Sequence, residues 1–173
     1  RGAMTLTIPT GVPSMGTRRV VFIPGTVGNI DAITVTEANA GENVSCYITR
    51  TGLTKTLTQN KITDSRYCSA QDFQRFGSKA KDMSLQYTFN LGEPTEDEAR
   101  LALQEGLEGV LVEFFQVDED AETFAADDWY QATPIVLGEQ DVVPVEDNAI
   151  DRINQAVAVS GSWTPLRQLV AGA

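Results

Sequence analysis

The sequence contains no histidine and only two cysteines, and these absences exclude several kinds of site. A zinc site would lack ligands, because Cys46 and Cys68 do not stand in a short metal-binding spacing. A cysteine nucleophile would lack the imidazole base that usually activates it. A cytosolic origin favours two reduced thiols, although a disulfide between them stays open. We therefore expect no metal, no cofactor and no catalytic residue.

Basic side chains are scarce in the second half of the chain. Residues 1–89 carry ten Lys or Arg and six Asp or Glu, whereas residues 90–173 carry three and eighteen. The formal net charge of −11 argues against affinity for nucleic acid, because phosphate binding needs a basic surface. Part of the imbalance serves solubility. The opposite signs of the two halves also suit a head-to-tail contact between copies.

Long apolar runs are absent too, so no segment approaches the length of a membrane span. Residues 1–3 resemble the remnant of a cleaved expression tag ahead of Met4, and no signal-peptide pattern follows, so we expect synthesis in a cytoplasm. We expect residues 4–17, with two prolines, to form an N-terminal arm and residues 162–173 a C-terminal arm. Residues 18–161 then form one domain.

The chain does contain a series of short segments that are β-branched or alternate between apolar and polar residues. Strands are predicted at residues 18–23, 33–37, 44–50, 83–91, 109–117, 131–138 and 151–161. A further short strand is possible within residues 51–61. Seven or eight strands with one helix predict a mainly β fold, either a two-sheet β-sandwich or a partly open barrel.

A single helix is predicted over residues 95–105. Thr95 and Glu98 have the spacing of a capping box, and acidic residues fill the first turn. Gly106 stands where a helix commonly ends. Because this helix interrupts the strands in mid-chain, we expect it to pack against the outside of the sheets.

The acidic second half contains two patterns that partly resemble a functional site, a calcium-binding loop and a pair of catalytic carboxylates, and neither pattern is complete. Asp118, Asp120 and Glu122 resemble the start of a calcium loop. That loop would need glycine and glutamate where the chain has Thr123 and Trp129. Other carboxylates could serve as a hydrolytic pair only by accident, since nothing in the sequence brings two of them together. We expect a solvated surface here.

Residues 51–81 are predicted as a long loop. They include the sequence ITDSRYCSAQDFQRFG at residues 62–77, which has two arginines, three aromatic residues and little alternation. Loops of this length in a compact domain are usually functional or disordered. We interpret this one as a basic loop that lies across a neighbouring subunit. The residues expected to make the contact are Arg66, Tyr67, Phe73, Arg75, Phe76, Lys79 and Lys81.

Several short strings stand in a characteristic order along the chain. They are Thr63-Asp64-Ser65-Arg66-Tyr67-Cys68, Phe73, Gly77, Leu85-Gln86-Tyr87, Gly106, Gly109, Asp127-Asp128, Pro134, Gly138-Glu139-Gln140, Pro144, Asn148, Arg152-Ile153, Gln155 and Val159-Ser160-Gly161. In this order and spacing they resemble the major tail protein, or tail tube protein, of long-tailed bacteriophages, most closely those of phages that infect actinobacteria. The resemblance covers about residues 18–161.

The resemblance implies a structural virion protein and no enzyme. Subunits of that family form hexameric rings, in which neighbouring sheets join into a β-barrel around a channel. The rings stack into a tube through which the genome passes without specific binding. Further implied partners are the tape measure, terminator and distal tail proteins, with synthesis in the host cytoplasm and no membrane. Strand alternation gives Gln86, Thr88 and Glu113 as candidates for side chains that face the channel.

Two alternatives stay open. A tail terminator or completion protein would also form a ring, but it would cap the tube instead of repeating along it. A β-sandwich that binds carbohydrate or protein would use exposed aromatic side chains, for which Trp129, Tyr130 and Trp163 are candidates.

Overall fold

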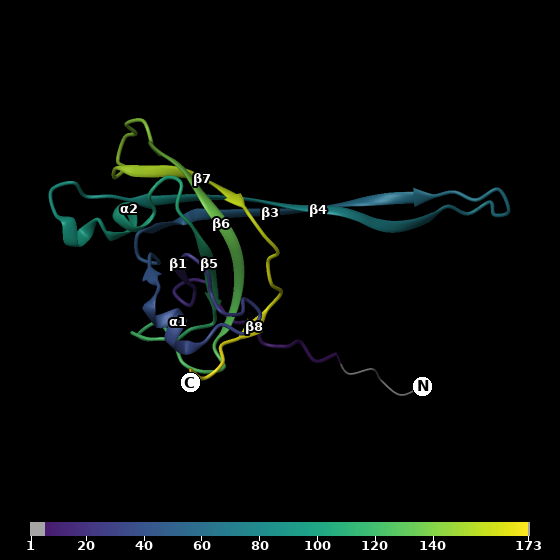
Figure 1. Cartoon of the computed structure of the whole chain (residues 1–173), viewed down its shortest axis with the longest axis horizontal. Helices are drawn as coiled ribbons and strands as arrows, with labels where there is room; N and C mark the ends of the chain where they lie inside the picture. Colours follow the sequence, from purple (N-terminus) through teal and green to yellow (C-terminus); the bar gives the residue numbers. More distant parts are fainter. Residues whose placement is uncertain (1–5, 173) are drawn as a thin grey trace.

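The computed structural model describes residues 6–172, which form an elongated molecule around one bent antiparallel sheet (Figure 1). The predicted tag remnant at residues 1–3 lies outside the described residues. In chain order the elements are β1 (Arg19–Pro24), α1 (Val35–Ala40), β2 (Glu42–Asn43), β3 (Ile48–Asp64), β4 (Phe73–Thr88), η1 (Pro94–Glu96), α2 (Glu98–Ala102), β5 (Glu108–Phe115), β6 (Trp129–Val142), β7 (Arg152–Val159) and β8 (Arg167–Gln168). The predicted mainly β fold is confirmed.

The sheet runs in the order β2-β1-β5-β6-β7-β4-β3, and β8 pairs with β6 as a side branch. β6 joins two layers, because its first half pairs with β5 and its second half with β7. A register shift between Leu137 and Gln140 marks the passage of β6 from one layer to the other. β1 and β5 lie in one layer and β7, β4 and β3 in the other, so the barrel that they begin is left open (Figure 1).

Two apolar clusters hold the layers together. The first lies between the layers, and Ala99 and Leu103 close it from α2 and the residue after it. The second lies on the other face of β1, β5 and β6, where α1 covers it and Phe114 stacks on Phe124 with 4.0 Å between ring centroids. Successive residues of β1 enter the two clusters in turn, as the two-residue period of a strand requires.

The strand predicted over residues 33–37 is wrong, because the short helix α1 begins there. Thr34 Oγ1 accepts a hydrogen bond from the backbone N–H of Glu37 at 3.2 Å, and the Glu37 carboxylate accepts one from the N–H of Thr34 at 2.9 Å. This reciprocal pair is a capping box. The β-branched residues that suggested a strand belong instead to the helix and to its approach, where Ile33 is buried in the second cluster.

The helix predicted over residues 95–105 is shorter than expected. The 3-10 turn η1 precedes α2, and α2 spans five residues. The cap expected at Thr95 is not formed. Asp97 precedes the helix instead, and its carboxylate accepts a hydrogen bond from the N–H of Asn90 at 3.3 Å and pairs with Arg100. Because Asp97 is almost fully buried, these contacts fix where the helix begins.

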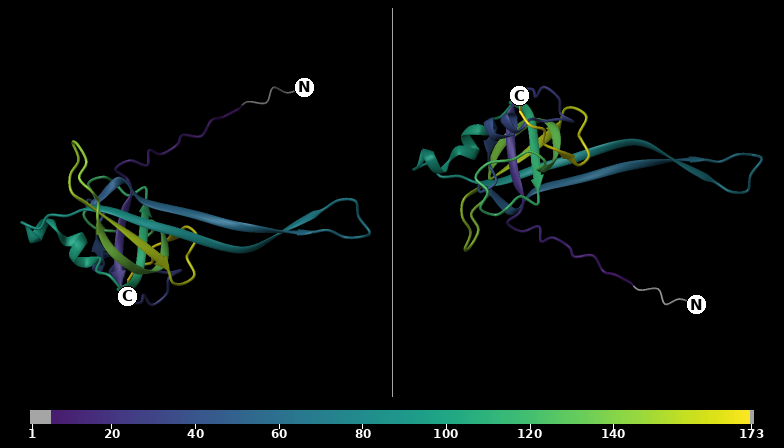
Figure 2. Two further views of the ribbon diagram at one scale, coloured as in Figure 1. Left: turned by 90° about the horizontal axis from the view of Figure 1, so that it is seen from above. Right: turned by 90° about the horizontal axis from the view of Figure 1, so that it is seen from below.

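The long loop predicted over residues 51–81 is also wrong, because β3 and β4 form a two-stranded hairpin there. The hairpin is paired from Leu53 and Leu85 at its root outward, and only residues 65–72 form its turn. It projects far beyond the rest of the molecule, with both faces in solvent (Figures 1 and 2). Since no face is buried, the sequence needs no apolar alternation, which was the signal that the prediction required.

The C-terminal segment predicted as an arm packs against the domain instead. β8 pairs with β6, and Leu169 is buried in the second cluster. Thr164 is buried as well, and its Oγ1 accepts a hydrogen bond from the backbone N–H of Ala132 at 3.0 Å. Single apolar residues in a short segment give no periodic pattern, so the sequence could not show this packing.

A network of polar side chains crosses the first cluster beside α2. Gln155 on β7 is buried, and its amide donates hydrogen bonds to the carbonyls of Leu103 at 2.8 Å and Gly138 at 2.9 Å. Its Oε1 accepts a hydrogen bond from the Tyr87 hydroxyl at 3.0 Å. That hydroxyl accepts one from Gln140 at 2.8 Å, and Gln140 also donates to Leu103. The network ties α2, β4, β6 and β7 together with its polar groups satisfied.

Stability should fall above pH 10 because of Tyr87. Burial raises the pKa of Tyr87 from 10.0 to about 12, and the hydrogen bond from Gln140 offsets part of that rise. Between these values the folded chain keeps a proton that the unfolded chain has lost, so the free energy of unfolding decreases as the pH rises. Urea midpoints should fall over this interval, and they should fall less in Tyr87→Phe. An equal fall in both chains would contradict this account.

Candidate assembly surfaces

The layer of β6, β7, β4 and β3 has one buried face and one polar face. Leu85 and Tyr87 on β4 and Ile153 on β7 point into the first cluster, so the residues between them point away from it. We call this second side the outer polar face. Its residues include Thr54, Thr56, Asp82, Ser84, Gln86, Thr88, Glu139, Asp141, Arg152 and Asn154.

Hydrogen bonds between strands order the outer polar face. Gln86 Nε2 donates to Asn154 Oδ1 at 2.8 Å. Gln86 Oε1 accepts from Thr49 and from Arg152, each at 3.1 Å. Arg152 also pairs with Glu146, which compensates its charge. Such cross-strand pairs hold polar side chains in place, so this face is ordered and hydrated.

Two of the three predicted channel residues, Gln86 and Thr88, lie on the outer polar face. The outer polar face also carries the carboxylates of Asp82, Glu139 and Asp141, which the sequence analysis did not name and which have no ion-pair partner in the described part of the chain. Asp82 could have been found, because it is in phase with Gln86 and Thr88 along β4. The other two could not, since the register shift within β6 decides where they point.

Glu113, the third predicted channel residue, lies apart from the other two, between the two layers of the bent sheet. It is on the same side of β5 as Leu111 of the first cluster, and its side chain is only 14% exposed. Arg18 pairs with it at 2.9 Å, and Lys55 pairs with its other oxygen. Both cations also lie over the ring of Phe115. The charge of Glu113 is therefore compensated within its own chain.

The layer ends in two strand edges that are unpaired among the described residues. β3 pairs only with β4, which leaves the backbone groups of its other edge free. On the opposite side, residues 138–142 of β6 extend beyond β5, whose last ladder partner is Val136. Unpaired edges are templates for pairing with another chain.

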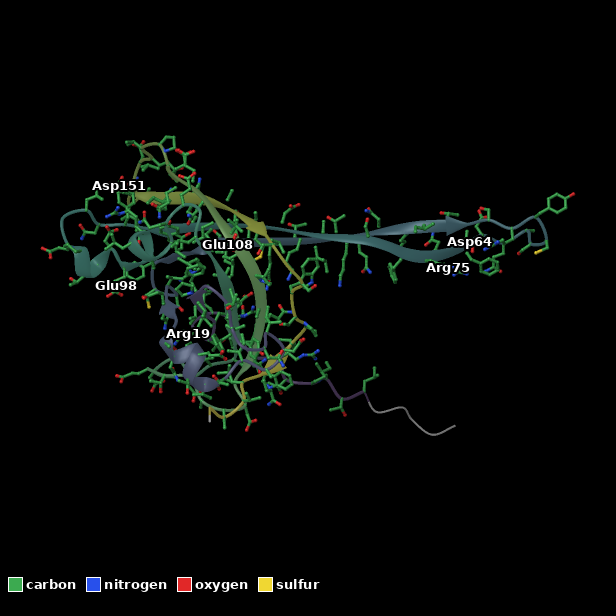
Figure 3. The ribbon with its side chains drawn as sticks, viewed as in Figure 1. Arg19, Asp64, Arg75, Glu98, Glu108 and Asp151 are labelled. Atoms are coloured by element: carbon green, nitrogen blue, oxygen red, sulfur yellow. The ribbon has the colours of Figure 1, made fainter. Side chains whose placement is uncertain are left out.

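The distal part of the hairpin contains five of the seven residues predicted for an inter-subunit loop. These are Arg66, Tyr67, Phe73, Arg75 and Phe76. Tyr67 and Phe76 are exposed, and Asp64 holds Arg66 at 2.6 Å and Arg75 at 3.5 Å (Figure 3). A two-stranded ribbon has no core of its own. Exposed aromatic side chains on such a ribbon are typical of a contact with another molecule.

The other two predicted loop residues, Lys79 and Lys81, lie closer to the body. Their ammonium groups stand over the ring of Trp163, at 5.1 and 4.8 Å from its centroid. Burial and the neighbouring Lys55 lower the pKa of Lys81. These cation–π contacts join the C-terminal segment to the hairpin, so both lysines are occupied within their own chain.

The aromatic residues of the sugar-binding alternative do not share a surface. Tyr130 is buried, and its hydroxyl accepts a hydrogen bond from the N–H of Ile33 and donates one to the carbonyl of Ile30, each at 3.0 Å. Trp163 lies beneath the two lysines. Of the three, Trp129 alone is freely exposed, so the three do not form one shared stacking surface.

The described residues also bear on metal, redox and membrane roles. Cys46 and Cys68 are exposed free thiols at opposite ends of the hairpin. Within residues 6–172 no group of three potential ligands could hold a metal ion. No helix in the same range is long and apolar enough to cross a membrane.

The end of the molecule opposite the hairpin is acidic. Residues 91–105 around α2 and residues 143–151 between β6 and β7 together carry eight acidic and one basic side chain, and we call these two segments the acidic end. The hairpin over residues 57–80 carries four basic and two acidic side chains. Figure 3 shows Glu98 at one end of the long axis and Arg75 at the other. Opposite charges at two ends suit a head-to-tail contact.

Unpaired sheet edges, a projecting hairpin and oppositely charged ends define a structural subunit that assembles with further copies. The family comparison makes this specific. Residues 5–172 match the family model described as phage tail tube protein, and the chain therefore belongs to the phage tail tube protein family. It is a tube-forming structural component of the phage tail, in a family of structural proteins and not of enzymes.

Two solved structures are similar over most of their length. A chain of "Cryo-EM structure of the anti-feeding prophage (AFP) baseplate, 6-fold symmetrised" has a TM-score of 0.47 and 10% identity, covering 95% of this chain and 97% of that chain. A chain of "Crystal structure of Hcp protein" has a TM-score of 0.37 and 11% identity, covering 82% and 88%. No curated protein matches the sequence.

Proposed function

We propose that this chain builds the tail tube as stacked hexameric rings, with its outer polar face lining the channel that the genome crosses. The observation that carries the proposal is a polar sheet face bounded on both sides by unpaired edges. Such a face can continue from copy to copy without burying its polar side chains. Membership of the family shows that the chain forms a tube. The proposal adds that the tube consists of rings and states how the subunit is oriented within each ring.

The two free edges support ring closure. In the proposal, the outer edge of β3 in one copy pairs with residues 138–142 of the next copy. The contact joins two different edges, so it is heterologous and repeats until the ring closes. Closure removes every free edge of the layer. Main-chain hydrogen bonds supply the affinity, as in other cases of strand addition.

The charge of the outer polar face supports passage of DNA. Duplex DNA carries about one negative charge per 1.7 Å of axis, so a basic lining would retain it. Asp82, Glu139 and Asp141 give this face uncompensated carboxylates, which repel phosphate and let DNA slide. Gln86 and Thr88 would face the channel beside them. Glu113 has no such role in this arrangement, because its charge is already paired.

The charges at the two ends support stacking of the rings. The hairpin of one ring would lie against the acidic end of a subunit in the next ring. Both surfaces also expose apolar side chains. On the hairpin these are Ile62, Tyr67, Phe73 and Phe76, and on the acidic end they are Leu91, Leu101, Val145 and Ile150. Apolar contacts between them would add to the attraction of opposite charges.

The rest of the tail completes the proposed role. The tape measure protein would occupy the channel during assembly, and terminator and distal tail proteins would bind the two ends of the tube. Residues 4–17 would act as an arm of the subunit, unlike the C-terminal segment. The order of sequence strings supports an origin in a phage of actinobacteria. A phage structural protein of this kind would be synthesised in the host cytoplasm.

Electron microscopy and thiol accessibility test the proposal. Negatively stained concentrated protein should show tubes with sixfold end views. In a chain with Cys46→Ser and Cys68→Ser, Asn154→Cys should react with a bulky polyethylene-glycol maleimide as a free subunit and be protected in tubes. Asp120→Cys, on an exposed turn, controls for general loss of reactivity. The small reagent N-ethylmaleimide should label the cysteine of either variant, both in the free subunit and in tubes.

The outcomes separate the proposal from its alternatives. Bulky labelling of Asn154→Cys in intact tubes would place the outer polar face on the outside and contradict the channel. Rings that never elongate would favour a tail terminator or completion protein.

A further inference from the structure

The N-terminal arm exposes apolar side chains that its own chain leaves uncovered. Leu6 and Ile8 are 84% and 89% exposed, and Val12 and Met15 are exposed as well. Residues 6–14 form no helix or strand, and the arm runs away from the body (Figure 2). An uncharged segment with four exposed apolar side chains is typical of a contact with another molecule.

Hydrogen bonds at the root of the arm fix its direction. Thr17 Oγ1 donates to the carbonyl of Pro13 at 2.9 Å, and the carbonyl of Thr17 accepts from the N–H of Val117 at 3.0 Å. Gly16 adopts a φ of 80°, which favours glycine, and its carbonyl accepts from Arg19 at 2.7 Å. These bonds hold residues 13–19 in place, so the arm leaves the body in the direction that Figure 2 shows. Its apolar side chains are therefore available to a second copy.

An open aromatic groove lies beside the root of the arm. It has a volume of about 420 Å³ and is lined by Arg18, Phe115, Gln116, Trp129, Gln131 and Leu166. Trp129 is 46% exposed and Leu166 is 51% exposed. The one charged residue of the groove, Arg18, is paired with Glu113 and lies 4.4 Å from the centroid of the Phe115 ring. The groove thus combines apolar side chains with two neutral glutamines, and its single charge is compensated.

The arm and the groove match in chemistry. Pro9 and Pro13 restrict the arm to extended conformations, so docking costs it little further conformational entropy. Extended segments that contain proline are commonly bound in aromatic-lined grooves. Neither surface carries an unpaired charge, which distinguishes this pair from the hairpin and the acidic end. Eight extended residues reach about 25 Å, which is enough to cross to an adjoining copy.

We propose that residues 6–13 of one copy lie in the groove of a second copy, with Ile8 and Pro9 against Trp129 and Leu166. The inference rests on the proposed function only in requiring that copies adjoin one another. Ring number, the direction of stacking and the lining of the channel do not enter it. Because every chain has both an arm and a groove, the contact links copies in series.

A synthetic peptide of residues 6–15 tests the contact on the full-length protein, kept below the concentration at which it assembles. In a Trp163→Phe chain, Trp129 is the sole tryptophan, so its emission reports on the groove. The peptide should shift that emission to shorter wavelength in a saturable manner. A peptide with Ile8→Asp and Val12→Asp should bind more than about tenfold more weakly, because buried aliphatic side chains supply most of the contact.

Variants of the protein separate the possible outcomes. Leu166→Asp should abolish the shift, whereas Leu101→Asp, at an exposed leucine of the acidic end, should leave it unchanged. No shift, or a shift that survives Leu166→Asp, would overturn the inference. A change in Trp129 emission caused by Ile8→Asp within the single-copy protein would place the arm in its own groove, and it too would overturn the inference. Tube formation, scored separately by microscopy, still decides the proposed function.

Discussion

A chain in which residues 58–80 are replaced by Asn-Gly is expected to fold like the parent and to form no tubes. The cut keeps the pair of Leu57 with Lys81, so Lys81 still lies over Trp163 and the first cluster is complete. Asn-Gly is the preferred sequence for a two-residue hairpin turn. The removed side chains are exposed or half-buried, so the free energy of unfolding should change by less than about 1 kcal/mol.

Assembly should fail because the removed residues include all the basic and aromatic side chains that we assign to the contact between rings. Calorimetry measures the first half of the prediction and negative-stain microscopy the second. Phe76→Ala should weaken assembly partially, whereas Gln74→Ala, an exposed polar residue on the same strand, should not. Tubes formed by the truncated chain would show that the hairpin does not stack the rings. A wider deletion of residues 51–81 is a poorer test, because it also removes Leu53 from the edge of the core.

The inner and distal halves of β4 show what a sequence can and cannot reveal. Leu85 and Tyr87 are buried, so burial imposes an alternation that predicts the strand. Phe73 and Phe76 lie on the same strand but outside the domain, where no face is buried. In the proposed assembly their apolar side chains contact another molecule, and a pattern derived from one chain cannot reveal such a contact.

The candidate channel face was predictable in part for a similar reason. The residues on β4 follow from a two-residue period that continues out of the core, and this period places Gln86 and Thr88 on the outer polar face. Glu139 and Asp141 follow a register shift in β6, which reverses the phase that alternation would assign. For Glu113 the strand was predicted correctly, but its ion pairs were not. Arg18 and Lys55, which compensate its charge, are far from it in the sequence.

The basic and acidic halves of the sequence contribute to opposite ends of the folded molecule. The basic half includes the hairpin and the acidic half includes α2 and the turn between β6 and β7, which lie at opposite ends of the long axis (Figure 3). Part of this charge is compensated within the chain, as at Arg18 with Glu113 in the body and Arg100 with Asp97 in the acidic end. The two ends of the long axis still differ in the sign of their net charge, and these are the surfaces to which the stacking contact is assigned.

Gln155→Ala should lower the free energy of unfolding by about 3–5 kcal/mol. The substitution removes three hydrogen bonds from a buried residue and leaves the Gly138 carbonyl and the Tyr87 hydroxyl short of a partner. It also opens a cavity between β7 and α2. Leu103 is affected less, because Gln140 still donates to its carbonyl. In a chain of this length the loss corresponds to a fall of roughly 10 °C in the melting temperature.

Asn154→Ala is the matched control, because Asn154 precedes Gln155 on β7 but points to the outer polar face. Its substitution should change stability by less than about 0.5 kcal/mol in thermal melts followed by circular dichroism. Gln155 also holds the Gly138 carbonyl at the register shift in β6. Its loss should therefore disturb Glu139 and Asp141 and weaken tube formation even well below the melting temperature. Equal effects of the two substitutions would mean that the backbone alone sets the register shift, and that the buried network does not orient the acidic edge of the proposed channel face.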